Sequence, residues 1–232
     1  MNKPIIFLGP SLSHEEGRKI FEADYRPPAK KGDFLRLASL SNEITIVGLV
    51  DGLFLQDYPP TPIEVYQLAI KKNMVLVGAA SLGALRAVEL EKFGMIGIGK
   101  IFQLYKEGKI NADDEVAVTF VEGDHKNQSE AMVDIRFNLF IAQRKGIINE
   151  TTKRAIVKVA KNTYFPYRNY MHIIDQTKKR YAMLSYQLES FRSYISTNRQ
   201  SLKEHDAIKL IKYIKMRYEM QGKNDSPSSR KT

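Results

Sequence analysis

The chain has no cysteine among its 232 residues. This absence excludes structural disulfides and thiolate metal sites. It also excludes any mechanism in which the protein itself carries a persulfide or a thioester, because both need a cysteine sulfur. The four histidines are far apart in the sequence and lack the spacing of metal ligands, so we expect no metal and no cofactor; they are His14, His125, His172 and His205.

Long apolar runs are also missing. No run approaches the roughly 20 apolar residues that a membrane-spanning helix needs, and the apolar run near the N-terminus is too short for a signal peptide. We therefore expect a soluble, cytoplasmic protein that does not enter a membrane. The glycine-punctuated stretch Phe93–Gly99 contains no G-x-G-x-x-G after a strand, so the sequence does not predict a dinucleotide site.

Charge is unevenly distributed along the chain, whose formal net charge is +10. Residues 1–141 carry 16 Lys and Arg against 19 Asp and Glu, whereas residues 142–232 carry 20 against 7. A mildly acidic body is thus followed by a strongly basic region. Such asymmetry indicates a polyanionic or acidic partner for the second part.

One stretch, Met74–Gly99, organises the prediction. It begins with bulky apolar residues typical of a buried parallel strand, turns at the small residues Gly78–Ser81, and continues with apolar residues at helical spacing. The frame Ala79–Gly83 has the small-x-Ser-x-small form of a nucleophile elbow. The N–H groups of the following helix start favour an anion at the same place.

Two other interpretations of this stretch stay open. Small residues before a helix also serve close packing of strand and helix, and Ser81 is a suitable N-cap for the helix that follows it. A cap and a nucleophile would compete for the same oxygen. Arg86 and Glu89 follow one and two turns later, where Arg86 could reach the mouth of the helix.

Two earlier strands, Pro4–Leu8 and Ile44–Val50, and the helices between them predict a β-α-β-α-β-α order. We therefore expect an α/β fold with a parallel sheet and helices on both faces. Sites in such sheets lie at the carboxyl ends of the strands. Asp51 follows the second strand there, either as a catalytic carboxylate or as an acceptor for loop N–H groups.

Beyond this core, the sequence predicts a strand directly after Asp113–Glu115, a polar loop over 121–128, and then helices. Three acids at Asp113–Glu115 fit either a divalent metal or a solvated turn, and Ser129 is expected to cap a helix over 130–144. From Ile147 onward the sequence predicts only helices. The expected domains are an α/β core over 1–146, a basic helical region over 147–221 and a disordered tail over 222–232.

Several segments together resemble the TfuA-like family. The match covers roughly residues 5–140 in the right order, and its seven segments are Gly9–Ser13, Pro27–Asp33, Val50–Phe54, Gly78–Leu90, Phe93–Phe102, Asp113–Val118 and Ser129–Arg136. There is a departure: many members have a Trp-His pair before the glutamate that Glu64 matches, and Thr61 and Pro62 stand there instead. If that histidine moves a proton in those relatives, another group must do so here.

The resemblance implies a role beside a YcaO enzyme in making backbone thioamides in a peptide or protein substrate. YcaO enzymes activate an amide with ATP and need a sulfur nucleophile. The resemblance implies that this chain supplies sulfide by hydrolysing the C-terminal thiocarboxylate of a ThiS-like carrier protein. Without cysteine it cannot relay the sulfur covalently, so it must release hydrosulfide or escort the carrier.

The resulting hypothesis assigns roles to particular residues. Ser81 attacks or positions the thiocarboxylate carbonyl, Arg86 and helix N–H groups hold the anion, and Asp51 or Asp114 acts as the base. The residues expected to bind the carrier tail are Gly9, Ser11, Gly52, Gly78, Gly83 and Glu89.

Two competing functions remain. A non-enzymatic adaptor would bind the carrier tail at the sheet and dock the basic helices onto the YcaO enzyme or the peptide. Nucleic-acid binding by the basic region is the less favoured alternative, although Tyr181, Tyr186 and Tyr194 are interleaved with basic residues as base stacking would need. Amphipathic packing of basic helices explains the same pattern more simply.

Overall fold

The computed structural model describes residues 2–40, 45–53, 58–121 and 126–224 of the chain. It packs as two compact units, one formed by Met1–Ile110 with Lys203–Thr232 and the other by Asn111–Leu202. We call them the sheet unit and the helical unit and describe each by itself. The expected domain boundary at residue 146 stays a prediction, since compact packing is not independent folding.

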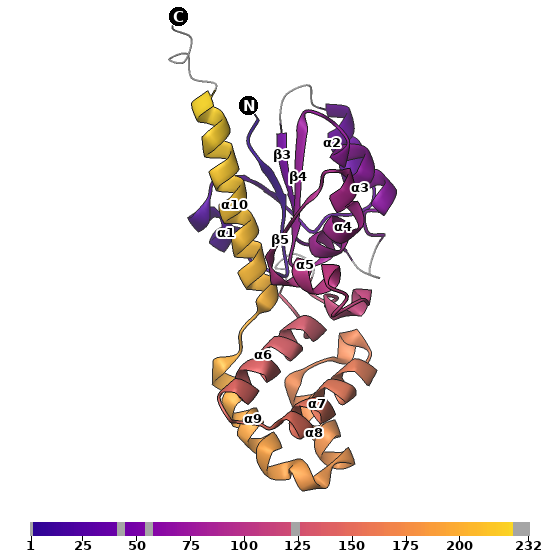
Figure 1. Ribbon diagram of the computed structural model, residues 1–232, viewed down its shortest axis with the longest axis vertical. Coiled ribbons are helices and arrows are strands. Elements are labelled where there is room, and N and C mark those ends of the chain that lie inside the picture. The colour runs from indigo at the N-terminus through magenta and orange to yellow at the C-terminus, as the bar shows by residue number, and fades with distance from the viewer. Residues whose placement is uncertain (1, 41–44, 54–57, 122–125, 225–232) are drawn as a thin grey trace, which may run out of the picture. The chain divides into compact units, whose positions relative to one another are not determined.

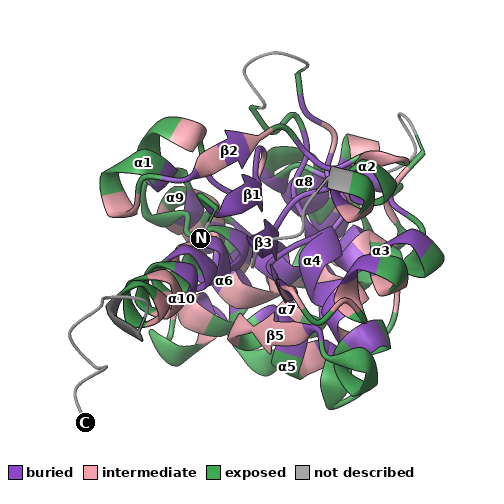
Figure 2. Cartoon of the chain, turned by 90° about the horizontal axis from the view of Figure 1, so that it is seen from above, coloured by how far each residue is buried: buried purple, intermediate pink, exposed green. Residues whose placement is uncertain are grey.

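The sheet unit is built on five parallel strands in the order β2-β1-β3-β4-β5. β3 pairs with both β1 and β4, so it is the central strand. All residues of β1 and β3 are buried (purple in Figure 2), which is what a parallel sheet covered on both sides requires. The strands are β1 (Ile5–Phe7), β2 (Asp24–Arg26), β3 (Thr45–Leu49), β4 (Met74–Ala79) and β5 (Ile96–Ile98).

Helices cover the two faces of this sheet (Figure 1). On one face, Leu210 and Ile214 of the last helix pack in one cluster with Ile6 and Ile46 of the strands. The other face is covered by the helices that connect β2 to β3, β3 to β4 and β4 to β5. The helices of this unit are α1 (His14–Ile20), α2 (Asp33–Leu40), α3 (Pro62–Ala69), α4 (Leu82–Leu90), α5 (Gly99–Lys106) and α10 (Leu202–Asn224).

The expected α/β class with helices on both faces of a parallel sheet is confirmed. Three of the predicted strands lie in the sheet, and the structure adds β2 and β5 at the two edges. The strand expected directly after Asp113–Glu115 was wrong, because residues 116–119 form no strand. The helix that was expected to belong with the basic helical region, α10, packs on the sheet. A β-carbon at Gly48 would lie 2.7 Å from Cδ1 of Ile214, so this helix and β3 are in close contact.

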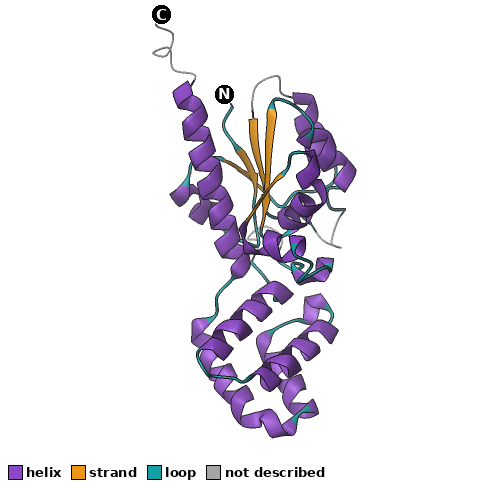
Figure 3. Ribbon diagram, viewed as in Figure 1, coloured by secondary structure: helices purple, strands orange, loops and turns teal. Residues whose placement is uncertain are grey.

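The helical unit contains four main helices and short 3-10 turns (Figure 3). Their apolar faces meet in one core that includes Leu139, Ile156, Ile173 and Phe191, one residue from each helix. Asn149 caps its helix as expected, by accepting a hydrogen bond from Thr152 N–H. The helices are α6 (Met132–Arg144), α7 (Glu150–Asn162), α8 (Tyr170–Arg180) and α9 (Ser185–Asn198).

Two local predictions were wrong. Ser129 does not cap α6, whose N-cap is Ala131; the Ser129 hydroxyl accepts a hydrogen bond from Thr119 N–H at 2.8 Å instead. The predicted start of the disordered tail, residue 222, is too early, because Gly222 still lies in α10. The part of the tail over 225–232 lies outside the described residues, and so does His125. In the part of the chain that the structure describes, every helix is too short or too polar to cross a bilayer.

Candidate functional site

The loops that follow β1 and β3 are joined by one carboxylate. Oδ2 of Asp51 accepts hydrogen bonds from the N–H groups of Gly9 and Ser11, each at 3.0 Å. Oδ1 accepts a third from the Ser11 hydroxyl at 2.6 Å. Asp51 is only 1% exposed. Of its two expected roles, the binding of loop N–H groups is the one that this geometry displays.

These loops lie where ligands bind in open α/β sheets. The strand order runs outward from β1 in one direction to β2 and in the other to β3, β4 and β5. The loops after β1 and β3 therefore flank the topological switch point, the usual position of a binding crevice. Three loops meet as expected, because Gly83 N–H at the start of α4 also donates to Val50 O, at 3.2 Å.

The turn between β4 and α4 is strained. Ala80 has a φ of +63°, the one residue other than glycine with positive φ among the described residues. Ser81 N–H bonds back to Ala79 O at 2.8 Å, which closes a three-residue turn around Ala80. Such turns are rare and cost energy, and strain of this kind is concentrated at functional sites.

The Ser81 hydroxyl is not used as a helix cap. Ser81 occupies the N-cap position of α4, with φ −109° and ψ −122°, but its side chain makes no capping hydrogen bond. Helix capping, the structural role considered for this hydroxyl, is therefore not one that it performs. The residue is 3% exposed, so the surrounding protein atoms cover it almost completely.

The glycines of this region serve close packing. A β-carbon at Gly83 would lie 1.7 Å from Leu49 O, and one at Gly78 would lie 2.2 Å from Gly83 O. A β-carbon at Gly52 would overlap Leu82. These positions are filled by the protein's own atoms, which supports the packing interpretation of the small residues. Their expected contact with a carrier tail stays a prediction.

Arg86 is engaged along the outside of α4. Its Nε donates to Pro60 O at 3.2 Å, and its Nη1 contacts both carboxylate oxygens of Glu89, the shorter distance being 2.8 Å. Among the described residues it makes no hydrogen bond to Ser81 or Asp51. The guanidinium would thus have to leave Glu89 before it could hold an anion at the helix mouth.

Glu64 is a buried carboxylate for which no catalytic role was predicted. Its Oε1 accepts from Gly32 N–H at 2.9 Å, and its Oε2 accepts from Thr61 N–H in the capping box that starts α3. One side chain thus fastens the 27–33 loop to the start of α3. The capping-box spacing of Thr61 and Glu64 is the sequence signal for half of this arrangement.

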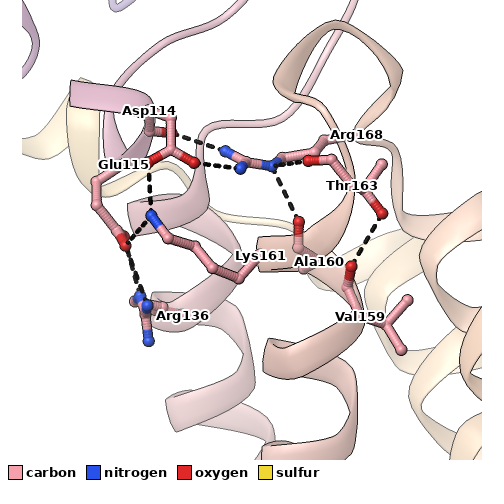
Figure 4. A network of polar contacts seen from close by, with 8 residues as sticks. All are labelled: Asp114, Glu115, Arg136, Val159, Ala160, Lys161, Thr163 and Arg168. Atoms are coloured by element: carbon pink, nitrogen blue, oxygen red, sulfur yellow. Dashed lines mark hydrogen bonds and ion pairs between the residues drawn. The ribbon is translucent and has the colours of Figure 1, made fainter. Parts of the chain in front are cut away.

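Asp114 belongs to the helical unit and is held by two cations (Figure 4). Lys161 Nζ contacts its Oδ1, and the guanidinium of Arg168, which is 1% exposed, contacts its Oδ2. Burial alone would raise the pKa of Asp114, but the bonds to Lys161 and Arg168 together hold it below its usual value. A carboxylate that is hard to protonate is a poor proton acceptor.

The neighbouring acid, Glu115, is held in the same network. Arg136 forms a bidentate pair with it at 2.9 and 3.0 Å, and Lys161 adds a contact at 3.0 Å (Figure 4). No group of three or more metal-ligating side chains occurs among the residues that the structure describes. The acids Asp114 and Glu115 thus compensate basic side chains of α6, α7 and the turn before α8.

Sequence reasoning missed Glu130, a glutamate whose pKa lies near neutrality. Burial raises its pKa to about 7, against the opposing effect of Arg199 and with a smaller contribution from Asp134. Its carboxylate lies 2.9 Å from Arg199. A buried acid of this kind is a candidate for proton transfer, and only its burial, which the sequence does not display, distinguishes it from other glutamates.

Asp134 and Asn138 continue this polar cluster along α6. Asp134 accepts from the Ser201 hydroxyl at 3.0 Å and from Leu202 N–H at 2.7 Å. Asn138 exchanges two hydrogen bonds with the backbone of Gln200. The cluster therefore fixes the segment that leads out of α9.

Comparison with known proteins identifies the chain. The family model described as TfuA-like protein matches residues 51–169, just over half of the sequence. The matched region includes Asp51, Ser81, Asp114 and Glu130, while Gly9 and Ser11 precede it. No curated protein matches the chain. On the extent of the family match, the chain belongs to the TfuA-like family.

Proposed function

We propose that the chain releases sulfide for thioamidation by hydrolysing the C-terminal thiocarboxylate of a ThiS-like carrier protein. Membership of the TfuA-like family supports an accessory role in thioamidation and an association with a YcaO enzyme. The observation that carries the hydrolytic proposal is the uncapped Ser81 hydroxyl directly after the strained residue Ala80. A peptide or protein would be the final acceptor of the sulfur.

The proposed reaction proceeds in two steps. The Ser81 oxygen attacks the thiocarboxylate carbon and loses its proton to a base. The base returns that proton to the departing sulfur, so hydrosulfide leaves and a serine ester remains. Water then hydrolyses the ester, which regenerates the hydroxyl and leaves the carrier with an ordinary carboxylate. Hydrosulfide is a far better leaving group than hydroxide, so modest activation suffices.

Asp51 is the better supported of the two expected bases. It lies on the loop that meets the start of α4, and its Oδ1 accepts one hydrogen bond, so this oxygen has unused acceptor capacity. Asp114 is bound by two cations that lower its pKa. Gly83 N–H is already bonded to Val50 O, so anion stabilisation would come from Arg86 after it leaves Glu89.

An assay of sulfide release from a thiocarboxylated carrier, without any YcaO enzyme, tests this function. Ser81→Ala should abolish release, whereas Ser13→Ala, which removes the cap of α1, is the matched control and should retain it. Undiminished release by Ser81→Ala would remove Ser81 from the nucleophile role.

A non-enzymatic adaptor is the second candidate function. It is favoured by the engagement of Asp51 and Arg86 in hydrogen bonds within the chain, which leaves neither poised for chemistry. In that case the wild-type protein would release no sulfide from the carrier alone, but would still raise the thioamidation rate of a YcaO enzyme.

A further inference from the structure

A groove of about 600 Å³ opens on the helical unit. One wall is the end of α7, the opposite wall is α8, and the turn 163–169 closes one side. It is lined by Val159, Asn162, Thr163, Pro166, Tyr167, Asn169, His172, Gln176 and Arg180. All of these residues lie between 159 and 180, so the groove is formed by consecutive elements of one unit.

Polar groups in the groove are free to bind a ligand. Among the described residues, the side chains of Asn162, Gln176 and Arg180 make no hydrogen bond or ion pair with the rest of the chain. Asn169 uses its Oδ1 to cap α8 and keeps its NH2 group. Amide side chains both donate and accept, which is the pattern needed to pair with a peptide backbone.

The lining residues of α8 show how long the groove is. His172, Gln176 and Arg180 are four residues apart and share one face of the helix. Eight residues of helix rise about 12 Å, which is the length of about four residues of extended chain. Tyr167 is 69% exposed and adds an aromatic surface at the start of this row.

The side chains that line the groove carry little charge. Arg180 is the one permanently charged side chain among the lining residues, and no carboxylate lines the groove. Lys161 and Arg168, which lie close by in sequence, are neutralised by Asp114 and Glu115 (Figure 4). A nucleic-acid strand needs several free cations along its phosphates, whereas one carboxylate needs only one guanidinium.

The groove is preformed. Arg168 is buried, and its Nε donates to Ala160 O and Thr163 O, at 3.1 and 3.0 Å (Figure 4). Thr163 in turn donates its hydroxyl hydrogen bond to Val159 O. These bonds fix the turn that separates α7 from α8, so binding would not require this wall to become ordered.

We propose that this groove binds a short, extended segment of an acidic polypeptide. The amides of Asn162 and Gln176 pair with its backbone, Arg180 binds a carboxylate, and Tyr167 packs against the chain. The proposal goes beyond sulfide release and does not depend on it, because its readout is peptide binding and not turnover.

An NMR titration of the full-length, ¹⁵N-labelled protein tests the proposal. The probes are a blocked pentapeptide of alternating glycine and glutamate, the same peptide with glutamine for glutamate, and a short oligothymidine. The glutamate peptide should shift the side-chain amide signals of Asn162 and Gln176, and the glutamine peptide should bind at least about tenfold more weakly.

Two variants compare one arginine inside the groove with one outside it. Arg180→Ala should weaken binding of the glutamate peptide about tenfold or more, while Arg154→Ala, which removes the same charge from an exposed part of α7, should change it less than about twofold. Equal affinity for both peptides, shifts confined to other residues, no shift at millimolar peptide, or equal loss in the two variants would overturn the proposal. Tighter binding of oligothymidine at the same signals would assign the groove to nucleic acid.

Discussion

Oδ1 of Asp51 and the hydroxyl of Ser11 lie 2.6 Å apart, in a hydrogen bond that joins the loops after β1 and β3. The bond is buried and involves a charged acceptor, which makes it stronger than a bond between neutral groups. Because these loops flank the switch point of the sheet, the pair lies at the position where ligands usually bind in open α/β sheets. Asp51 thus has a structural function that any catalytic function must accommodate.

Removal of the Asp51 carboxylate should destabilise the protein. Asp51→Ala leaves the buried donors of Gly9 and Ser11 without a partner, and we expect a loss of about 3 kcal/mol of unfolding free energy. Asp51→Asn keeps an acceptor oxygen and should lose only about 1 kcal/mol. Urea denaturation measures both values. A surface control, Asp175→Ala, should change stability by less than about 1 kcal/mol, since its carboxylate is 55% exposed.

Two serines at N-cap positions should respond differently to alanine. Ser13 accepts a hydrogen bond from Glu16 N–H, so Ser13→Ala should cost about 1 kcal/mol. Ser81 makes no such bond, and Ser81→Ala should leave the thermal midpoint nearly unchanged. If Ser81→Ala proved as destabilising as Ser13→Ala, a structural function of that hydroxyl would explain its presence, and a loss of activity in the variant would no longer identify a nucleophile.

Stability should fall as pH rises through the titration of Glu130. Its pKa is raised from 4.5 to about 7 by burial, so the folded state binds more protons than the unfolded state between these values. The free energy of unfolding therefore decreases from about pH 4.5 to about pH 7, by at most about 3 kcal/mol for a shift of this size. Thermal midpoints across this range, in one salt concentration, measure the effect.

A glutamine variant isolates that effect. Glu130→Gln cannot ionise, so it should remove most of the decrease and should be at least as stable as the wild type at pH 8. Glu150→Gln is the control, because Glu150 is a half-exposed glutamate of the same unit with a lowered pKa, and the decrease should persist in it. Parallel pH curves for wild type and Glu130→Gln would contradict the assigned titration.

Much of the sheet unit could be predicted because its strands and caps have local signals. The apolar runs that became β1, β3 and β4 are near-continuous, and Thr61 with Glu64 marks the start of α3. The edge strands β2 and β5 have three residues each and are only partly apolar, so they form through pairing with a neighbour. Pairing is a tertiary effect that no short window of sequence contains.

The sequence predicted that the loops at the strand ends meet, but it did not predict which residues the site side chains contact. The meeting of the loops follows from parallel topology alone, which the sequence displayed. Arg86 bonds to Pro60, and Asp114 pairs with Lys161 and Arg168. These partners are remote in the sequence or lie on another element, so the sequence alone does not indicate them. The raised pKa of Glu130 depends on burial among residues of α6 and the segment after α9. Distances of this kind arise only when the chain has folded.

Gly83 provides the sharpest test of how closely α4 approaches the sheet. The backbone of β3 occupies the space beside it, since an added β-carbon would lie 1.7 Å from Leu49 O and 2.6 Å from Leu49 C. Backbone atoms of a central strand cannot move aside cheaply, so Gly83→Ala should cost about 3 kcal/mol or more. Gly222→Ala is the opposite control: nothing lies within 4 Å of its added carbon, and alanine in a helix should stabilise by up to about 1 kcal/mol. Urea denaturation of both variants gives the comparison, and a Gly83→Ala protein as stable as the wild type would mean that α4 does not press on β3, which would also separate Ser81 from the loop that carries Asp51.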